Sequence, residues 1–174
     1  RQMCIETAII KDALYGGTAG SINLSLIGCK EIPTTGLSNW DGKLDALKSI
    51  YLPDITRIGV EGLAYCVFLE EINTPNVTSI HENAFGGCTN LQKITFGELT
   101  EVKGLSHDYD GILDPGVNTE RINLVLSENQ KVMTKNRQGN EYFWTPTKEY
   151  YKGSVEYGST SFLEYKFNSV SFKK

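Results

Sequence analysis

The chain has 174 residues, of which 40% are hydrophobic and 22% charged, so it is long enough to bury a sizeable core. A formal net charge of −4 argues against nucleic acid as a partner, since phosphates are bound by clustered Lys and Arg. No run approaches the roughly 18 apolar residues of a membrane span, so we expect no membrane-spanning segment. The sequence begins at Arg1 without an apolar leader, and we expect that an export signal has been removed.

The first predicted strand is SINLSLIG, residues 21–28, in which Ile22 and Leu24 alternate with polar residues. The segment that follows is long enough for one degenerate coil, and we expect Trp40 to cover an open end of the core there. We interpret residues 1–46 as an N-terminal strand and capping coil.

Residues 47–104 repeat with a period of 22. The apolar positions that recur are Leu47, Leu69 and Leu91, then Ile50, Ile72 and Ile94, then Leu63 and Phe85, then Cys66 and Cys88. A spacing of three between apolar residues within each copy argues against a helix, because it drifts off one helical face by about 60° per step. A period of 20 to 29 with Leu and Ile at fixed offsets is typical of leucine-rich repeats, whose coils bury their apolar positions by stacking on one another.

His81 precedes Cys88 by seven residues, which raises the question of a Cys/His catalytic pair. One repeat earlier the cysteine recurs as Cys66, but the histidine is replaced by Gly59. We therefore interpret the two cysteines as one buried structural column, and we expect no disulfide between them. Four cysteines without a C-x-x-C spacing, and only two histidines, make a zinc site improbable.

The segment NVTSIHENAFGGCTNLQKITF, residues 76–96, resembles the BspA-type leucine-rich repeats of bacterial surface and secreted proteins. Residues 54–75 fit the same pattern, with Gly62 and Leu63 in place of its alanine-phenylalanine pair. The resemblance covers residues 47–104. It implies a β-rich leucine-rich-repeat solenoid of right-handed stacked coils, and a role in surface adhesion or host-protein binding outside a bacterial cell.

Residues 105–174 are predicted to form a β-rich C-terminal capping module, with strands at RINLVLS, 121–127, and FNSVSF, 167–172. More than half of the chain's aromatic residues lie between Tyr142 and Phe172. They favour packing within a small β unit, and a platform of rings for binding sugars stays open as the alternative.

Asp108, Asp110 and Asp114 surround a glycine, as at the start of a calcium loop. The glutamate that would close an EF-hand loop is missing, so we interpret the segment as a solvated loop. No catalytic set, phosphate loop or dinucleotide fingerprint occurs, and we expect no enzyme, no metal and no cofactor.

The candidate binding residues are the outward positions on the concave strand face of the repeats. They are Ser49, Tyr51, Glu71, Asn73, Lys93 and Thr95. Their chemistry changes from coil to coil while the core columns hardly change, which favours a variable surface on a rigid scaffold. The hypothesis is a non-catalytic protein that binds a protein or other macromolecule at the bacterial cell exterior. Glycan binding by the C-terminal aromatics is the alternative.

Overall fold

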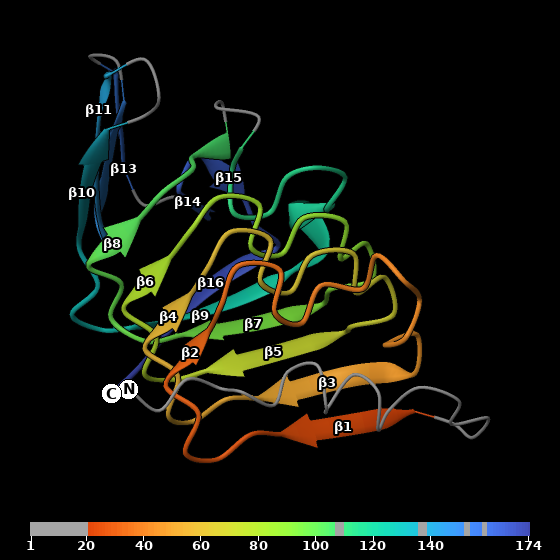
Figure 1. The fold of residues 1–174 in the computed structure, drawn as a ribbon. Coiled ribbons are helices and arrows are strands. Elements are labelled where there is room, and N and C mark those ends of the chain that lie inside the picture. The colour runs from red at the N-terminus through yellow and green to blue at the C-terminus, as the bar shows by residue number, and fades with distance from the viewer. Residues whose placement is uncertain (1–20, 107–109, 136–138, 152–153, 158–159) are drawn as a thin grey trace.

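A computed structural model of the chain shows a stack of coils capped by a β-meander (Figure 1). The residues that it describes are 21–106, 110–135, 139–151, 154–157 and 160–174.

One side of the stack is a six-stranded parallel sheet in the order β1-β3-β5-β7-β9-β16. Its strands are β1 (Ile22–Ser25), β3 (Leu47–Tyr51), β5 (Glu71–Thr74), β7 (Lys93–Phe96), β9 (Asn123–Ser127) and β16 (Ser169–Lys173). A second side is a four-stranded parallel sheet in the order β2-β4-β6-β8. Its strands are β2 (Glu31–Ile32), β4 (Arg57–Ile58), β6 (Ser79–Ile80) and β8 (Glu101–Val102).

Each of the first four coils contributes one strand to each sheet. Helix is almost absent from the described residues, which include one short 3-10 turn, η2 (Thr119–Arg121). The predicted leucine-rich-repeat solenoid is confirmed. The segment 21–28, predicted as a strand, is β1, and it starts the six-stranded sheet.

The core consists of columns of equivalent apolar residues. Ile50, Ile72 and Ile94 are in register on neighbouring strands of the six-stranded sheet, and all three are buried. Each branched side chain is covered by its counterparts one coil away, about 4.8 Å along the stack, so no coil could bury its own column alone. The repeat period in the sequence is therefore the spacing of the stack.

Turns form the third side of the coils, where backbone hydrogen bonds join one coil to the next. Leu63 N–H donates to the Ala84 carbonyl at 2.8 Å, and Phe85 N–H donates to the Ile112 carbonyl at 2.8 Å. Gly87 has φ +74°, and a Cβ there would lie 2.8 Å from the Tyr65 ring. Only glycine fits both this backbone conformation and this contact.

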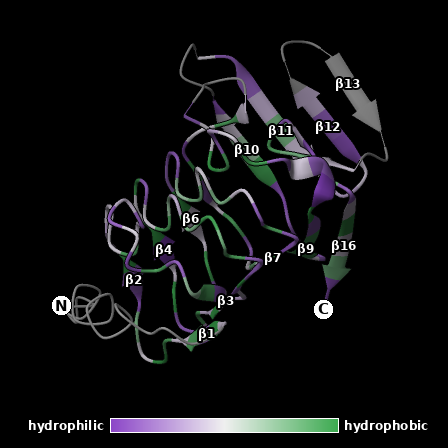
Figure 2. Cartoon of the chain, turned by 90° about the vertical axis from the view of Figure 1, so that its right-hand side faces the viewer, coloured by the Kyte–Doolittle hydropathy of each residue, from purple (hydrophilic) through white to green (hydrophobic). Residues whose placement is uncertain are grey.

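After β9 the chain leaves the solenoid and then returns to it (Figure 2). The excursion consists of an antiparallel meander and a hairpin: β10 (Val132–Lys135), β11 (Glu141–Thr145), β12 (Lys148–Tyr151), β13 (Ser154–Tyr157), β14 (Ser161–Phe162) and β15 (Tyr165–Lys166). The predicted strands at 121–127 and 167–172 are β9 and β16, and both extend the sheet of the repeats. The division of the chain at residues 46 and 104 stays a prediction.

The C-terminal aromatics include five buried rings: Tyr142, Trp144, Phe162, Tyr165 and Phe167. The Trp144 and Phe162 rings pack edge to face with centroids 4.9 Å apart. A ring that is covered on both faces cannot stack on a sugar, so packing is the role that the structure favours for these five.

Candidate functional site

The six residues predicted for binding lie together on the outer face of the six-stranded sheet, which we call the strand face. They form two adjacent columns that follow from the strand register: Ser49, Glu71 and Lys93 in one, and Tyr51, Asn73 and Thr95 in the other. The sheet thus brings residues of three coils onto one continuous surface.

Polar side chains pair along the column of Ser49, Glu71 and Lys93. Lys93 Nζ donates a hydrogen bond to Glu71 Oε1 at 2.8 Å, as their equivalent positions suggested. Ser49 Oγ donates to Asn23 Oδ1 on β1 at 2.6 Å. These contacts link neighbouring strands of the sheet through their side chains.

Tyr51 and Thr95 differ strongly in exposure. Tyr51 is 43% exposed and is the large aromatic of the strand face, whereas Thr95 is only 7% exposed. Thr95 lies in register between Asn73 and Val125. Little of the Thr95 side chain is therefore accessible to a partner, and the role of the six residues in binding stays a prediction.

The strand face continues onto β9 and β16, which the repeat period does not reach. Asn123 extends the Lys93 column, and its Oδ1 accepts hydrogen bonds from Asn168 Nδ2 at 2.8 Å and Ser169 Oγ at 2.7 Å. The alternation of apolar and polar residues within each segment was the sequence signal that predicted these two strands. The 22-residue period did not assign the two strands to the same sheet as the repeats.

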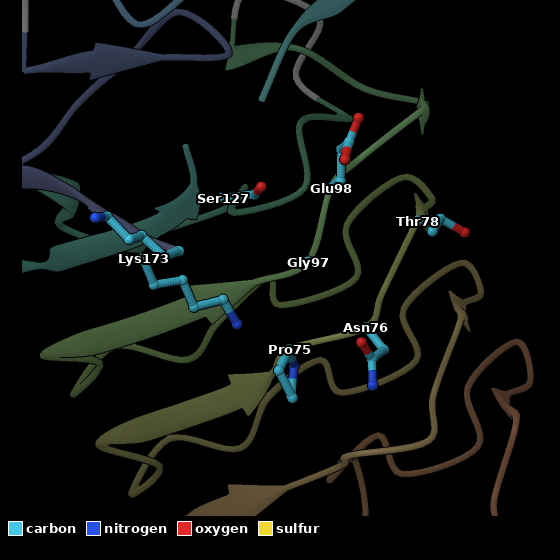
Figure 3. A pocket seen from close by; sticks show the side chains of 8 residues that line it. Pro75, Asn76, Thr78, Gly97, Glu98, Ser127 and Lys173 are labelled. Carbon is cyan, nitrogen blue, oxygen red and sulfur yellow. The ribbon is translucent and has the colours of Figure 1, made fainter. Parts of the chain in front are cut away.

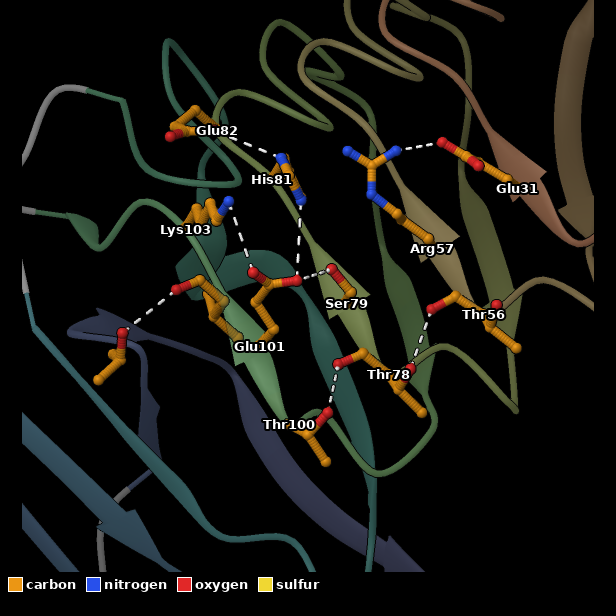
Figure 4. Close-up of polar contacts among 12 residues, drawn as sticks. Glu31, Thr56, Arg57, Thr78, Ser79, His81, Glu82, Thr100, Glu101 and Lys103 are labelled. Atoms are coloured by element: carbon orange, nitrogen blue, oxygen red, sulfur yellow. Dashed lines mark hydrogen bonds and ion pairs between the residues drawn. The ribbon is translucent and has the colours of Figure 1, made fainter.

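The four-stranded sheet carries a second polar surface that sequence reasoning missed (Figure 4). Glu31, Arg57, Ser79 and Glu101 occupy one column across its strands. Arg57 pairs with Glu31, and Ser79 Oγ donates to Glu101 Oε2 at 2.6 Å. The same 22-residue period that marks Ile80 and Val102 as buried would have placed Ser79 and Glu101 beside them.

Beside this column a ladder of threonines ties successive coils together. Thr56 Oγ1, Thr78 Oγ1 and Thr100 Oγ1 each donate to a backbone carbonyl one coil earlier, at 3.2, 3.2 and 3.3 Å. The hydroxyls are engaged within the scaffold, so this recurrence is structural.

His81 and Cys88, the residues of the hypothetical catalytic pair, have different partners. His81 is nearly buried, with Nε2 3.9 Å from Glu101 and Nδ1 3.8 Å from Glu82. Burial lowers the pKa of His81, and the charges of Arg57 and Lys103 lower it further against the opposing carboxylates. Cys88 Sγ instead lies 3.2 Å from the Leu63 carbonyl, to which it donates a weak hydrogen bond.

Two of the cysteines confirm the expected buried column of free thiols, whereas a third cysteine is not a free thiol. Cys66 and Cys88 are buried and not disulfide-bonded. Cys66 Sγ donates to the Leu37 carbonyl at 3.4 Å, which repeats the contact of Cys88 one coil earlier. Cys29, by contrast, is disulfide-bonded.

A shallow pocket of about 410 Å³ lies where strands of the six-stranded sheet end (Figure 3). It is lined by Pro75, Asn76, Thr78, Gly97, Glu98, Ser127, Lys173 and Lys174. Partial burial lowers the pKa of Lys173. The sequence could not indicate this pocket, because the coils and the returning strand β16 meet there only in the folded chain.

Of the three aspartates considered for a calcium loop, Asp114 has a structural role. Asp114 Oδ2 accepts a hydrogen bond from the buried Tyr165 hydroxyl at 2.9 Å, and that hydroxyl accepts one from Leu113 N–H at 3.2 Å. Burial raises the pKa of Tyr165 far above its usual range, so the hydroxyl stays a donor. Asp108 lies outside the described residues.

Within the described residues, no group of three or more His, Cys, Asp or Glu side chains is placed to hold a metal ion. No helix in this part of the chain is long and apolar enough to cross a membrane.

Comparison with known proteins places the repeats in a family. Residues 42–106 match the profile of the BspA type leucine-rich repeat region in six copies. No curated protein and no solved structure matches the chain. The match covers the coils whose stacked columns and paired sheets are described above. Residues 42–106 therefore carry the pattern of a BspA type leucine-rich repeat region.

Proposed function

We propose that this chain is a non-catalytic adhesion or recognition protein that binds a protein partner outside the cell through the strand face. The observation that carries the proposal is the exposed Tyr51 ring, held on a rigid parallel sheet beside polar residues that vary between coils. Tyrosine offers a large amphipathic side chain at low entropic cost and is enriched among residues that dominate interface energies.

Tyr51 and Asn73 are the proposed anchor of the contact, since they are neighbours in register on β3 and β5. Glu71 and Lys93 already pair with each other at the surface, so they contribute little to affinity. Their charges tune the association rate and the choice of partner.

The disulfide at Cys29 supports a location outside the cytosol, because disulfides persist in oxidising compartments and are rare in reducing ones. The bacterial cell surface as the site of action rests on the family resemblance of residues 42–106.

Replacing Tyr51 and Asn73 together with alanine tests the proposal, once a partner has been captured with the intact chain from its natural surroundings. We expect binding at least tenfold weaker, about 1.4 kcal/mol, in calorimetric titration. The thermal midpoint should stay within a few degrees of the parent, because both side chains lie on the surface.

Phe68→Ala is the matched control, since Phe68 is 42% exposed, close to the value for Tyr51, but lies on the turn side. It should bind as the parent does. Parental affinity of the double variant combined with loss of binding in Phe68→Ala would move the site to the turn side and refute the proposal.

A further inference from the structure

Strand β16 is the last strand of the six-stranded sheet. Within the described residues β9 is its strand partner on one side, and no described strand pairs with its other side. β1, the opposite edge, lies at the far end of the sheet (Figure 2). A five-residue edge strand is a template onto which another strand can add.

The direction of the backbone groups in β16 follows from one hydrogen bond. Glu128 N–H donates to the Lys173 carbonyl at 3.0 Å, so the backbone of Lys173 points toward β9. Successive residues of a strand point their backbone groups to opposite edges. The N–H and C=O groups of Val170 and Phe172 therefore point to the outer edge of the sheet.

The apolar columns of the core also reach this edge. Val170 is in register with Leu124, and Phe172 with Leu126. Both leucines are fully buried, but Phe172 is 44% exposed, although the Trp144 ring lies 6.4 Å away. The last member of the column thus keeps nearly half of its apolar surface in water, a surface that one more strand would cover.

We propose that a second copy of this chain supplies that strand, with β16 paired antiparallel to β16 about a twofold axis at Ser171. The strand sequence SVSFK is self-complementary in this arrangement. Val170 of each copy lies opposite Phe172 of the other, and the two exchange backbone hydrogen bonds across the axis. An isologous contact of this kind closes on itself as a dimer.

Charge and chemistry fit the same register. Ser169 of each copy lies opposite Lys173 of the other, so the two lysines are at opposite ends of the pairing and do not repel directly. The apolar residues of both copies lie on the core side of the joined sheet. The strand faces of both copies then form one continuous surface, which would present two binding sites to a partner.

Light scattering over a concentration series tests the pairing on the full chain. We expect a mass that approaches twice 19.4 kDa as concentration rises. Phe172→Ser should weaken self-association at least tenfold, because it removes the apolar side chain that the second copy covers. A monomeric mass at every concentration, or unchanged association of a folded Phe172→Ser variant, overturns the proposal.

A pair of cysteine variants tests the register independently of stability. Directly opposed residues of antiparallel strands have Cα atoms about 4.5 to 5.5 Å apart, within the range that a disulfide accepts. Ser171→Cys lies on the twofold axis and should give a covalent dimer under mild oxidation. Ser169→Cys lies opposite Lys173 and should not. Equal cross-linking of the two variants, or none in Ser171→Cys, contradicts pairing about Ser171.

Discussion

Phe85 and Cys88 lie on the turn side of one coil, and both are fully buried. The Phe85 ring stacks on Phe96 with centroids 5.9 Å apart. We expect Phe85→Ala to cost about 3 to 5 kcal/mol of unfolding free energy through the cavity it leaves, and Cys88→Ala to cost less. Cys88→Ser should cost about 1 kcal/mol, because the Leu63 carbonyl can accept the new hydroxyl. Urea titrations measure all three, and a serine variant that is less stable than Phe85→Ala would contradict this account.

His81 makes the stability of the repeat region depend on pH. Its pKa in the folded chain lies below the ordinary 6.5, because burial and the nearby Arg57 and Lys103 disfavour the imidazolium. The unfolded chain therefore binds more protons, and stability is present above pH 6.5 and is lost as pH falls through the folded pKa. His81→Gln should flatten this part of the pH profile of thermal midpoints. A variant with an unchanged profile between pH 7 and 5 would show that His81 is not responsible.

Glu101, which faces His81, affects the stability of the protein at a lower pH than His81 does. The hydrogen bond from Ser79 is the main cause that lowers the pKa of Glu101, so its contribution is lost as pH falls below 4.5. Ser79→Ala provides the control variant, because it should change the acidic limb of the profile and leave the limb near neutrality unchanged.

Gln130 joins two elements that the local sequence pattern does not connect. Its fully buried side chain accepts from Leu99 N–H at 2.8 Å and donates to the Leu99 carbonyl at 2.9 Å, as a neighbouring strand would. Gln130→Ala leaves both groups buried without these partners, and we expect a loss of about 2 to 4 kcal/mol in urea unfolding. Asn129→Ala, at the exposed neighbouring position, should be within about 0.5 kcal/mol of the parent. Equal stabilities of the two variants would mean that water replaces the glutamine.

The whole molecule depends on both ends of the stack. β1 and β2 cover the first recognisable repeat, and β9 covers the last, so residues 47–104 alone would expose apolar columns at both ends. A coil stabilises only its neighbours, and uncapped ends expose the core to water. We expect the fragment to show no cooperative thermal transition in circular dichroism. A sharp transition in the fragment would show that the flanking strands are dispensable.

The sequence alone determined the stack of coils and its core. Ile50, Ile72 and Ile94 recur at one offset because every coil meets the same neighbours, so a local pattern encodes the packing of the repeats. Alternation also predicted the segments that became β1, β9 and β16 as strands. The strand face and its Glu71–Lys93 pair followed from the same period.

Only the tertiary structure decided where the chain departs from that period. An insertion after β8 and the meander before β16 break the 22-residue spacing, so the period did not assign β9 and β16 to the sheet of the repeats. The contacts of His81 with Glu101 and of Gln130 with the backbone of Leu99 are each made by one particular side chain. Each coil has the same pattern of buried residues because stacking gives every coil the same environment. A polar contact that occurs at only one coil does not recur with the 22-residue period, so the sequence pattern cannot predict it.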